Sequence, residues 1–430
     1  MAVKPSSYHL GIAIKDDMCA MGLRQNDVAK EMDMSPVRLN RLLNGDRSIP
    51  LKTLDVITEI IGKPAGYYYP QYLEDCLVVD VKRPKKRIQK FVTRTMELGL
   101  DELTQKAIHI MLNSGDYYEN LLSVGEDLRK IGRKKEAMFI LNMLTAESKG
   151  RPGRVIAMSY YRQLLVLLDE DLDKALEVAM KLCEYLPHVD EEERLEAHFK
   201  VVSTFRLNEK WDFVDTYGAK LVEIAKEAGR QDMVGDALIK RGIAARKKGE
   251  IPKALAIIDE YGKIGGLYAT WAEGNRLIVL IDDGELDKIP ELYRFMKKYP
   301  ERSFEYVEYY LEVLIRHELF DSIKDFFEDF PHEVEHLDDL FDNFSRYGRH
   351  IATFMYAKAT YFLKKGNYND GLEHAIKAAT TAADLRLHKL SMLNLKLIVE
   401  HIYKASEEQH KRCVEILELL SATDCFYKAV

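Results

Sequence analysis

The sequence predicts an all-α protein in which a small N-terminal helical domain precedes a long body of repeated helical hairpins. Two observations support this fold class. Nearly every segment beyond Lys90 has apolar residues spaced three and four apart, as on one face of a helix, and few segments alternate as strands do. Within this body, small residues and turn glycines recur at a constant spacing. The 430-residue chain is long enough for two or three domains.

Residues 22–49 predict two short helices separated by a tight turn. The first helix covers residues 25–32, and its inner side carries Val28, Ala29 and Met32. Asp33 and Met34 form the turn. Asp tolerates a left-handed backbone less well than Gly but better than most residues, so the turn is compatible with this sequence.

The second helix covers residues 36–43, and a third follows over residues 51–61. Ser35 is a good N-cap, and Pro36 costs nothing at the first helical position because its missing N–H would be unpaired there. Asn44 and Gly45 end the second helix, as these residue types do at helix C-termini. The expected core comprises Leu39, Leu42, Leu43, Leu54, Ile57, Ile60 and Ile61.

This stretch resembles the phage-repressor helix-turn-helix family (XRE type). The residues that match the pattern of that family are Gly22, Leu23, Gln25, Ala29, Ser35, Asn44 and Gly45. Asp33 departs from it, since the family usually has Gly in the turn. The resemblance covers the domain expected at residues 1–66 and implies a DNA-binding function.

The resemblance also implies which side chains contact DNA. Pro36, Val37 and Arg41 face base edges, and an Arg can grip a guanine edge with two hydrogen bonds. The residues expected mainly at phosphates are Gln25, Arg38, Asn40, Asn44 and Arg47. The alternative is a helical domain that has lost DNA binding or that uses this surface for protein contact.

Charge is distributed unevenly along the chain. The net charge is −7, yet residues 1–94 hold 16 Lys and Arg against 11 Asp and Glu, a balance of +5 that leaves −12 for the rest. An acidic body is repelled by DNA, so the basic head must make the contacts. Residues 67–94 are expected to be a basic linker, because Lys82–Arg94 contains seven basic residues and no acidic one. This run is either a solvated linker or a source of additional phosphate contacts.

Composition predicts a soluble intracellular protein. No apolar run approaches the roughly 20 residues that span a bilayer, and the N-terminus lacks the pattern of a signal peptide. The five cysteines are scattered without a CxxC pair, as expected of reduced thiols.

A repeat runs through the body of the chain. A small residue stands seven positions before a turn glycine, and another stands five positions after it. The three clear copies are Gly125, Gly132 and Ala137; Gly242, Gly249 and Ala254; and Ala359, Gly366 and Gly371. Weaker copies are centred on Ala175, Val214, Ile289, Ile323 and Cys413. About eight hairpins are expected at a period near 34 residues.

This pattern resembles the tetratricopeptide repeat, which implies a tetratricopeptide-like right-handed superhelix with a concave peptide-binding face over residues 95–383. In the register of that repeat, the residues expected on the concave face are Arg206, Asp236, Arg246, Trp271, Asn275, Glu305, Glu308, Tyr309, Glu312 and Tyr356. Three of them, Glu305, Glu308 and Glu312, share one helical face and favour a cationic group on a peptide. Asn275 is expected to clamp a peptide backbone. The alternative is that these are ordinary solvated charges.

The sequence contains almost no motif that is typical of an enzyme active site. His332–His336 fits the H-E-x-x-H pattern of zinc proteases, but Pro331 places it at a helix start or loop among acidic residues. No Walker-type phosphate loop, nucleophile elbow or dinucleotide fingerprint occurs. We therefore expect no enzyme activity, no metal and no cofactor.

Together, the two parts resemble the RRNPP family of peptide-responsive regulators, and most closely the arbitrium receptors of temperate Bacillus phages. The local traits behind the second likeness are residues 72–82 and Leu207–Glu209. The resemblance implies a transcription factor in the cytoplasm of a bacterial host cell. It would bind a double-stranded DNA operator as a homodimer and take part in a phage lysis–lysogeny decision. A short signalling peptide in the groove shifts the population of superhelical states and thereby changes the spacing of the two heads. To read two half-sites, the recognition helices must lie about 34–36 Å apart, or a multiple of that distance.

Dimerisation is implied for the C-terminal helices at residues 384–430, where an apolar face carries Leu385, Leu387, Leu390, Leu393 and Leu397. The alternative function is a tetratricopeptide-repeat scaffold that regulates a protein partner without specific DNA binding.

Overall fold

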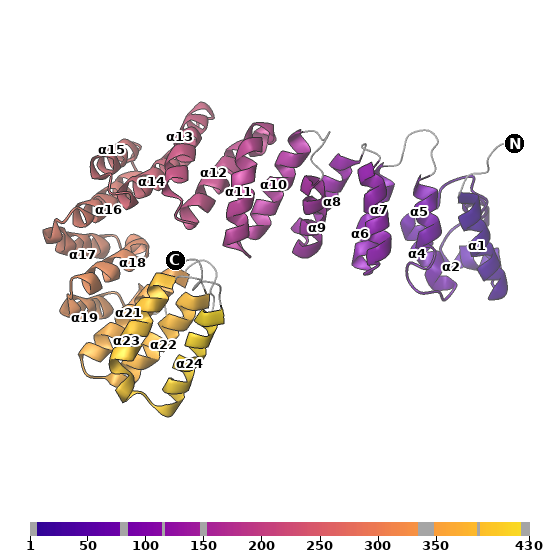
Figure 1. The fold of residues 1–430 in the computed structure, drawn as a ribbon. Helices are drawn as coiled ribbons and strands as arrows, with labels where there is room; N and C mark the ends of the chain where they lie inside the picture. Colours follow the sequence, from indigo (N-terminus) through magenta and orange to yellow (C-terminus); the bar gives the residue numbers. More distant parts are fainter. Residues whose placement is uncertain are drawn as a thin grey trace. The chain divides into compact units, whose positions relative to one another are not determined.

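The computed structural model describes residues 7–77, 85–113, 117–146, 153–333, 348–384 and 388–422. All regular secondary structure in these ranges is helical, so the predicted all-α fold is confirmed (Figure 1). The chain divides into two compact units, Met1–Met233 and Val234–Val430. None of the helices in the described ranges has the length and apolar character needed to cross a bilayer.

Four helices form the head at the start of the first unit: α1 (Ser7–Ala20), α2 (Gln25–Glu31), α3 (Pro36–Leu43) and α4 (Leu51–Ile60). The three predicted helices begin at the expected residues, whereas α1 was not predicted. Its Leu10, Ile14 and Met18 are buried and complete the core of the head. Met32 and Ile60, which were expected inside, are only half-buried, whereas Thr58 on the same helix as Ile60 is buried.

The next helices are α5 (Tyr69–Leu77), α6 (Lys85–Glu97) and α7 (Asp101–Asn113). They cover most of the segment for which a linker was expected. The aromatic rings of Tyr69, Tyr72 and Phe91 are fully buried and lie 5.4–6.5 Å apart between centroids. This aromatic cluster packs α6 against α5, so the described part of residues 67–94 is ordered structure. The domain limits at residues 66 and 94 remain a prediction.

Helical hairpins make up the remainder of both units. In the first unit they are α8 (Tyr118–Lys130) with α9 (Lys134–Ala146), α10 (Gly153–Leu167) with α11 (Leu172–Tyr185), and α12 (Glu191–Leu207) with α13 (Trp211–Glu227); the short η1 (Leu186–His188) joins α11 to α12. Buried Arg162 on α10 binds Glu126 of α8 at 2.7 Å and Glu193 of α12 at 2.6 Å. This ion triad ties three successive first helices together.

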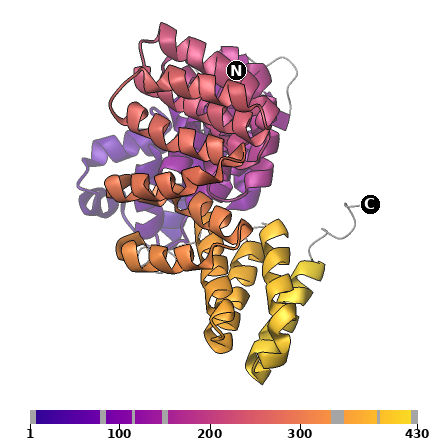
Figure 2. The ribbon, with the colours of Figure 1, turned by 90° about the vertical axis from the view of Figure 1, so that its left-hand side faces the viewer.

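In the second unit, the helices are α14 (Gln231–Lys247, which begins just before the boundary), α15 (Ile251–Gly262), α16 (Leu267–Asp282), η2 (Leu286–Lys288), α17 (Ile289–Lys298), α18 (Pro300–Arg316), α19 (Phe320–Asp329), α21 (Gly348–Lys364), α22 (Tyr368–Asp384), α23 (His388–His401), η4 (Ile402–Lys404) and α24 (Glu407–Ala422). Figure 2 shows the last helices packed side by side, with α22 contacting α21, α23 and α24.

The predicted turn glycines lie between the two helices of their hairpins. Gly132, Gly249 and Gly366 have φ of +82°, +74° and +81°, a left-handed backbone that glycine adopts without steric cost. In two other hairpins of the described residues, a glutamate takes the place of this glycine. Glu209 between α12 and α13 and Glu318 between α18 and α19 adopt the same backbone, with φ of +55° and +56°.

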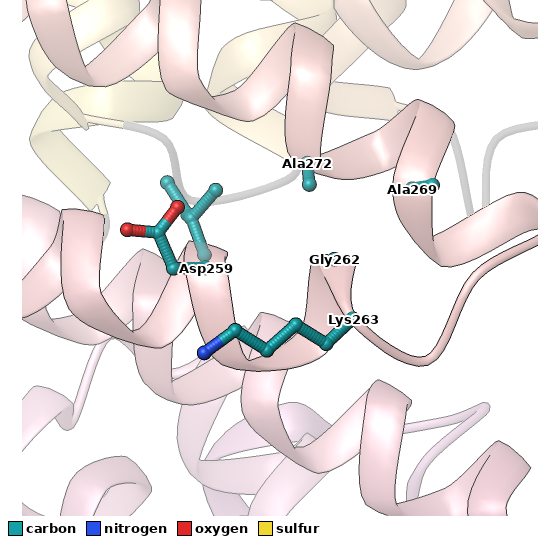
Figure 3. A pocket seen from close by; sticks show the side chains of 6 residues that line it. Asp259, Gly262, Lys263, Ala269 and Ala272 are labelled. Atoms are coloured by element: carbon teal, nitrogen blue, oxygen red, sulfur yellow. The ribbon is translucent and has the colours of Figure 1, made fainter.

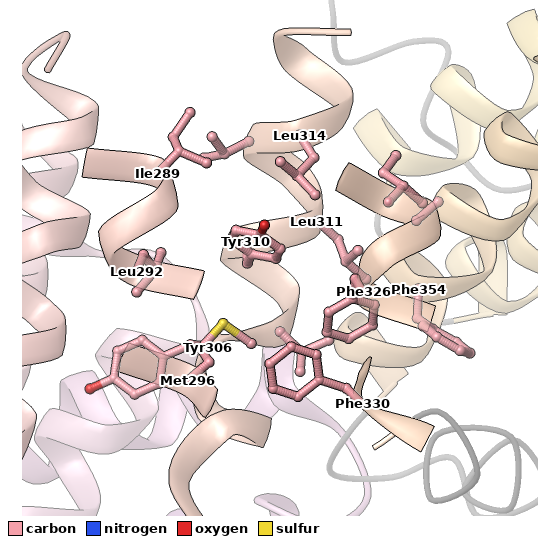
Figure 4. Close-up of a cluster of buried hydrophobic side chains, with 14 of the residues drawn as sticks. Ile289, Leu292, Met296, Tyr306, Tyr310, Leu311, Leu314, Phe326, Phe330 and Phe354 are labelled. Carbon is pink, nitrogen blue, oxygen red and sulfur yellow. The ribbon is translucent and has the colours of Figure 1, made fainter. Parts of the chain in front are cut away.

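A continuous aromatic core holds the middle of the second unit together. Tyr306 and Tyr310 of α18 pack against Phe326 of α19 and Phe330 at its end, with Phe354 of α21 in the same cluster (Figure 4). Each buried large side chain of this kind contributes about 1.5–3 kcal/mol, so packing between neighbouring hairpins dominates stability here.

Candidate functional site

The candidate recognition surface of the head is the outer face of α3, which we call the recognition helix. Leu39, Leu42 and Leu43 are buried beneath it, as predicted. The residues expected at DNA that are exposed are Pro36, Val37, Arg38, Asn40, Arg41, Asn44 and Arg47, whereas Gln25 is half-buried. Val37 is 64% exposed. Seven of the eight residues lie on α3 or within four residues after it, and the contacts of all eight with DNA remain a prediction.

Local sequence explains the shape of this surface. The Ser35 side chain accepts a hydrogen bond from the backbone N–H of Arg38 at 3.3 Å, as an N-cap does. Gly45 after the helix has φ of +78°. Asp33 in the preceding turn has φ of +49°, so the turn adopts the left-handed backbone for which the family uses Gly.

Helix α1 supports the C-terminal end of α3. A methyl group at Gly11 would lie 2.0 Å from the carbonyl oxygen of Leu43, so only glycine allows this approach. One turn along α1, the Lys15 ammonium donates a hydrogen bond to Oδ1 of Asn44. Asn44 in turn donates from Nδ2 to Oδ1 of Asn40 at 3.3 Å. The recognition helix is therefore held from behind by α1.

Helix α5 fastens the head to the helices that follow it. The hydroxyl of Tyr68, just before α5, donates to Asp17 of α1 at 2.8 Å, and Lys63 pairs with the same carboxylate at 3.0 Å. Both partners lower the pKa of Asp17, which keeps it ionised. The Tyr69 hydroxyl donates to Asp55 of α4 at 2.6 Å.

Two arginines of the predicted basic run also bind the head. Arg94 of α6 pairs with Asp55 at 3.2 Å. Arg87 donates to the hydroxyl of Tyr72 at 3.0 Å and to the backbone carbonyl of Ile49 at 3.3 Å. These two side chains hold the head against α5 and α6, so part of the basic run has a structural role. Lys82–Pro84 of that run lie outside the described residues.

In the second unit, several residues expected at the peptide form a connected cluster on α14, α16 and α18, which we call the Trp271 cluster (Asp236, Tyr268, Trp271, Arg302, Glu305). Tyr268 donates to Asp236 at 3.1 Å and its ring contacts Trp271 edge to face at 5.3 Å. Trp271 donates to Glu305 at 2.5 Å, while Arg302 lies over the indole and binds Glu305 at 3.3 Å.

A second cluster lies on the same three helices and is centred on Asp282; we call it the Asp282 cluster (Arg246, Asp282, Tyr309, Glu312, Arg316). Arg246 binds Asp282 at 3.0 Å, and the Tyr309 hydroxyl donates to the same carboxylate at 2.8 Å. Burial is the main reason that the pKa of Tyr309 is raised, so this phenol stays protonated. Arg316 lies 3.8 Å from Asp282 and binds Glu312 at 2.8 Å.

The remaining peptide-site residues do not join either cluster through a described hydrogen bond. Asn275 donates to the buried hydroxyl of Tyr261 at 2.9 Å, and Tyr356 is half-buried on α21. Arg206 lies in the first unit, on α12. Glu305 and Glu312 are already paired with arginines, so the expected open row of carboxylates is partly neutralised. The role of all ten residues in peptide binding remains a prediction.

Sequence reasoning missed four members of these clusters: Tyr268, Asp282, Arg302 and Arg316. The i, i+3 spacing of Arg302 and Glu305 and the i, i+4 spacing of Glu312 and Arg316 are detectable signals of such pairs. Asp282 could not be found in this way, because its partners lie on two other helices, α14 and α18.

A shallow hollow of about 410 Å³ opens between α15 and α16 (Figure 3). The small residues Gly262, Ala269 and Ala272 leave the space, and the charged side chains of Asp259 and Lys263 border it. Asp259 is ion-paired with Arg276. None of these residues was expected at the peptide.

The H-E-x-x-H sequence lies mostly outside the described residues, since only His332 and Glu333 fall within them. Within the described ranges, no group of three or more His, Cys, Asp or Glu side chains is arranged to hold a metal ion.

Comparison with known proteins gives one family match. Residues 14–68 match the helix-turn-helix family model. Among solved structures, the chain is similar to PlcR of Bacillus thuringiensis, in its crystal structure with the peptide PapR7 and DNA. The alignment has 16% identity, covers 59% of this chain and 95% of that chain, and gives a TM-score of 0.23. A circular tandem repeat protein is similar at 13% identity over 96% of this chain and 89% of that one, with a TM-score of 0.14. No curated protein matches.

Proposed function

We propose that this chain is a peptide-responsive, DNA-binding transcriptional regulator that acts as a homodimer. The observation that carries the proposal is the outer face of α3. Its Arg38, Asn40 and Arg41 are exposed above three buried leucines, within the residues that match the helix-turn-helix model. Arginine side chains at this place suit both phosphates and guanine edges.

The proposed peptide site comprises the Trp271 and Asp282 clusters. Their half-buried aromatic rings can cover apolar peptide side chains, and their paired charges can exchange partners with the termini or charged side chains of a peptide. The Arg–carboxylate pairs link α14, α16 and α18. A peptide that replaces one partner of such a pair therefore removes a contact that holds these helices together. This is the physical basis we propose for a shift in conformational population.

The proposed homodimer uses the C-terminal helices. Met392, Val399 and Tyr403 on or next to α23, and Val414 and Leu417 on α24, are 53–70% exposed apolar side chains. Among the leucines expected on this face, Leu393 is 39% exposed and Leu390 and Leu397 are half-buried, while Leu385 and Leu387 lie outside the described residues. Residues 1–66 carry only nine basic residues against eight acidic ones, so the electrostatic attraction of a single head to DNA is weak. The proposal therefore requires two copies of the head.

The DNA proposal is tested by electrophoretic mobility shift of the full chain on fragments from its own gene neighbourhood. We expect a sequence-specific shift that Arg41→Ala abolishes and that Lys106→Met, a charge-matched change on α7, leaves intact. No specific shift with any fragment, with or without peptide, would overturn the proposal and favour the scaffold function.

The peptide proposal is tested by calorimetry with short peptides encoded next to the gene. One of them should bind, Trp271→Ala should weaken it at least tenfold, and the bound peptide should change operator affinity. A role in a phage lysis–lysogeny decision is supported by the sequence resemblance to arbitrium receptors. If it is correct, deletion of the gene from a prophage will change the frequency of lysogeny.

A further inference from the structure

The C-terminal end of the recognition helix carries a hydrogen-bond relay that begins outside the recognition surface. Lys15 of α1 donates to Asn44 Oδ1, and Asn44 Nδ2 donates to Asn40 Oδ1 at 3.3 Å. The three side chains come from α1 and from the C-terminal end of α3. Lys15 and Asn44 are 29 positions apart along the chain. Lys15 is half-buried, whereas Asn40 and Asn44 are exposed.

The hydrogen bonds of the relay can run in only one direction, from donor to acceptor. A lysine ammonium carries three donors and no acceptor, so the atom of Asn44 that faces it must be the carbonyl oxygen. The Asn44 amide nitrogen must then point along α3, where it donates to the oxygen of Asn40. With its oxygen turned back toward Asn44, Asn40 presents its two amide N–H groups outward. Among the described residues, no acceptor for these N–H groups is recorded.

We propose that Lys15 is a positioning residue for DNA recognition, which orients Asn40 as an N–H donor toward a phosphate oxygen of the operator. A phosphate offers only acceptors and therefore matches this face. A bidentate contact with adenine needs both the oxygen and the nitrogen of the amide to face the base, and the relay leaves only the nitrogen outward. This inference rests on the proposed DNA-binding function and assigns Asn40 to positioning the head rather than reading a base.

The backbone is built to permit the relay. Gly11 and Lys15 lie one turn apart on the same face of α1. The contact between Gly11 and the Leu43 carbonyl brings α1 close to the end of α3, which places Lys15 beside Asn44. The same position puts the ammonium near the C-terminal carbonyls of α3, where the helix dipole favours a positive charge.

The test is a double-mutant cycle on the full chain, with a duplex selected by the wild-type protein from a random-sequence pool. Lys15→Met and Asn40→Ala should each weaken binding about tenfold, as expected for one charge-supported hydrogen bond. The double variant should be no weaker than the worse single variant by more than about twofold, since both changes break one contact. Lys15→Arg, which keeps the donor and the charge, should restore binding, and Lys106→Met should have no effect.

Two outcomes contradict the inference. If the losses multiply to about a hundredfold in the double variant, Lys15 contacts DNA independently. If Asn40→Ala changes the base preference of the selected sites, instead of lowering affinity uniformly, Asn40 reads a base. If Lys15→Met lowers the melting temperature of the protein, the double-mutant cycle is repeated with Asn44→Leu in place of Lys15→Met, since this change also breaks the relay. A wild-type chain that binds no duplex contradicts the proposed function itself, which is a separate result.

Discussion

Gly11 is the residue at which α1 comes closest to the recognition helix. In most helix interiors, Ala in place of Gly stabilises a protein by roughly 0.5–1 kcal/mol. At Gly11 the added methyl group would lie 2.0 Å from the Leu43 oxygen, and backbone atoms cannot move aside cheaply. We expect Gly11→Ala to destabilise the head by about 1–3 kcal/mol, measured by denaturant unfolding.

Gly242 of α14 provides the matched control for this substitution. A methyl group there would lie 3.6 Å from Ile257, an ordinary van der Waals contact. Gly242→Ala should therefore raise the free energy of unfolding. If both alanine variants have the same effect on stability, the close approach at Gly11 is not what decides it.

His198 gives the first unit a pH-dependent stability. The side chain is buried on α12 and its Nδ1 has no hydrogen-bond partner in the described part of the chain. Burial, together with the charges of Lys220 and Arg194, lowers its pKa to about 4. The unfolded state binds a proton below pH 6.5, so stability is complete above that pH and falls as the pH drops toward 4.

We expect a loss of about 1 kcal/mol between pH 7.5 and pH 5.5 from His198 alone. Urea unfolding at these two pH values measures it, and His198→Gln, which does not titrate, should reduce the dependence by that amount. An unchanged pH dependence in the variant would contradict the assignment. Carboxylates interfere little in this range because they titrate mainly below pH 5.

At the level of single residues, the sequence predicted which side chains are buried or exposed better than it predicted which side chains contact each other. The buried leucines of α3 and the Ser35 cap follow from helical periodicity and capping chemistry, and both are confirmed. Lys15 was missed as a partner of Asn44, because no local pattern indicates a pair that only tertiary packing brings together. The exposed row of carboxylates expected from Glu305 to Glu312 was predicted without the arginines that neutralise two of its members.

At the level of helices and turns, Glu318 closes the α18–α19 hairpin where clear repeats have glycine. A left-handed backbone costs a residue with a Cβ roughly 1–2 kcal/mol, part of which the greater freedom of unfolded glycine offsets. Glu318→Gly should therefore raise the free energy of unfolding by about 0.5–1 kcal/mol, as measured by thermal or urea unfolding. Glu318→Ala keeps the Cβ and should give no such gain; equal stabilisation by both would point to the lost charge instead.

The same turn explains which hairpins the sequence revealed. The clear copies carry Gly132, Gly249 and Gly366, whereas Glu209 and Glu318 occupy the corresponding backbone position without the glycine signal. Helix α6 was interpreted as a linker because its charges suggested solvation. Two of those charges instead meet partners on the head, which lie far away in the sequence.

At the level of the whole molecule, we call the hydrogen bonds of Tyr68 and Tyr69 to the head the clasp; under the proposed function, a change in the body reaches the recognition helix through this clasp. The hydroxyls of Tyr68 and Tyr69 bind Asp17 of α1 and Asp55 of α4. Replacing both tyrosines by Phe removes these bonds and keeps the packing of the rings. Under the proposed function, the double variant should bind peptide with unchanged affinity, while the effect of peptide on operator affinity becomes smaller.

Calorimetry for the peptide and fluorescence anisotropy for the operator measure the two affinities. Tyr361→Phe, which removes a hydroxyl far along the chain from the head, serves as the control and should keep the full response. A double variant with a full response would show that the clasp does not transmit the signal.

The order of elements along the chain also determines the order in which they are made. The head and the helices that clasp it, α5 and α6, end at Glu97, whereas α23 and α24 come last. Domains generally fold as they leave the ribosome, N-terminal parts first. The recognition surface can therefore be complete while most of the body is still being synthesised. Under the proposed function, if pairing depends on α23 and α24, a nascent chain carries one finished head with weak affinity for DNA. A second head joins it only after the body that binds the peptide has been synthesised.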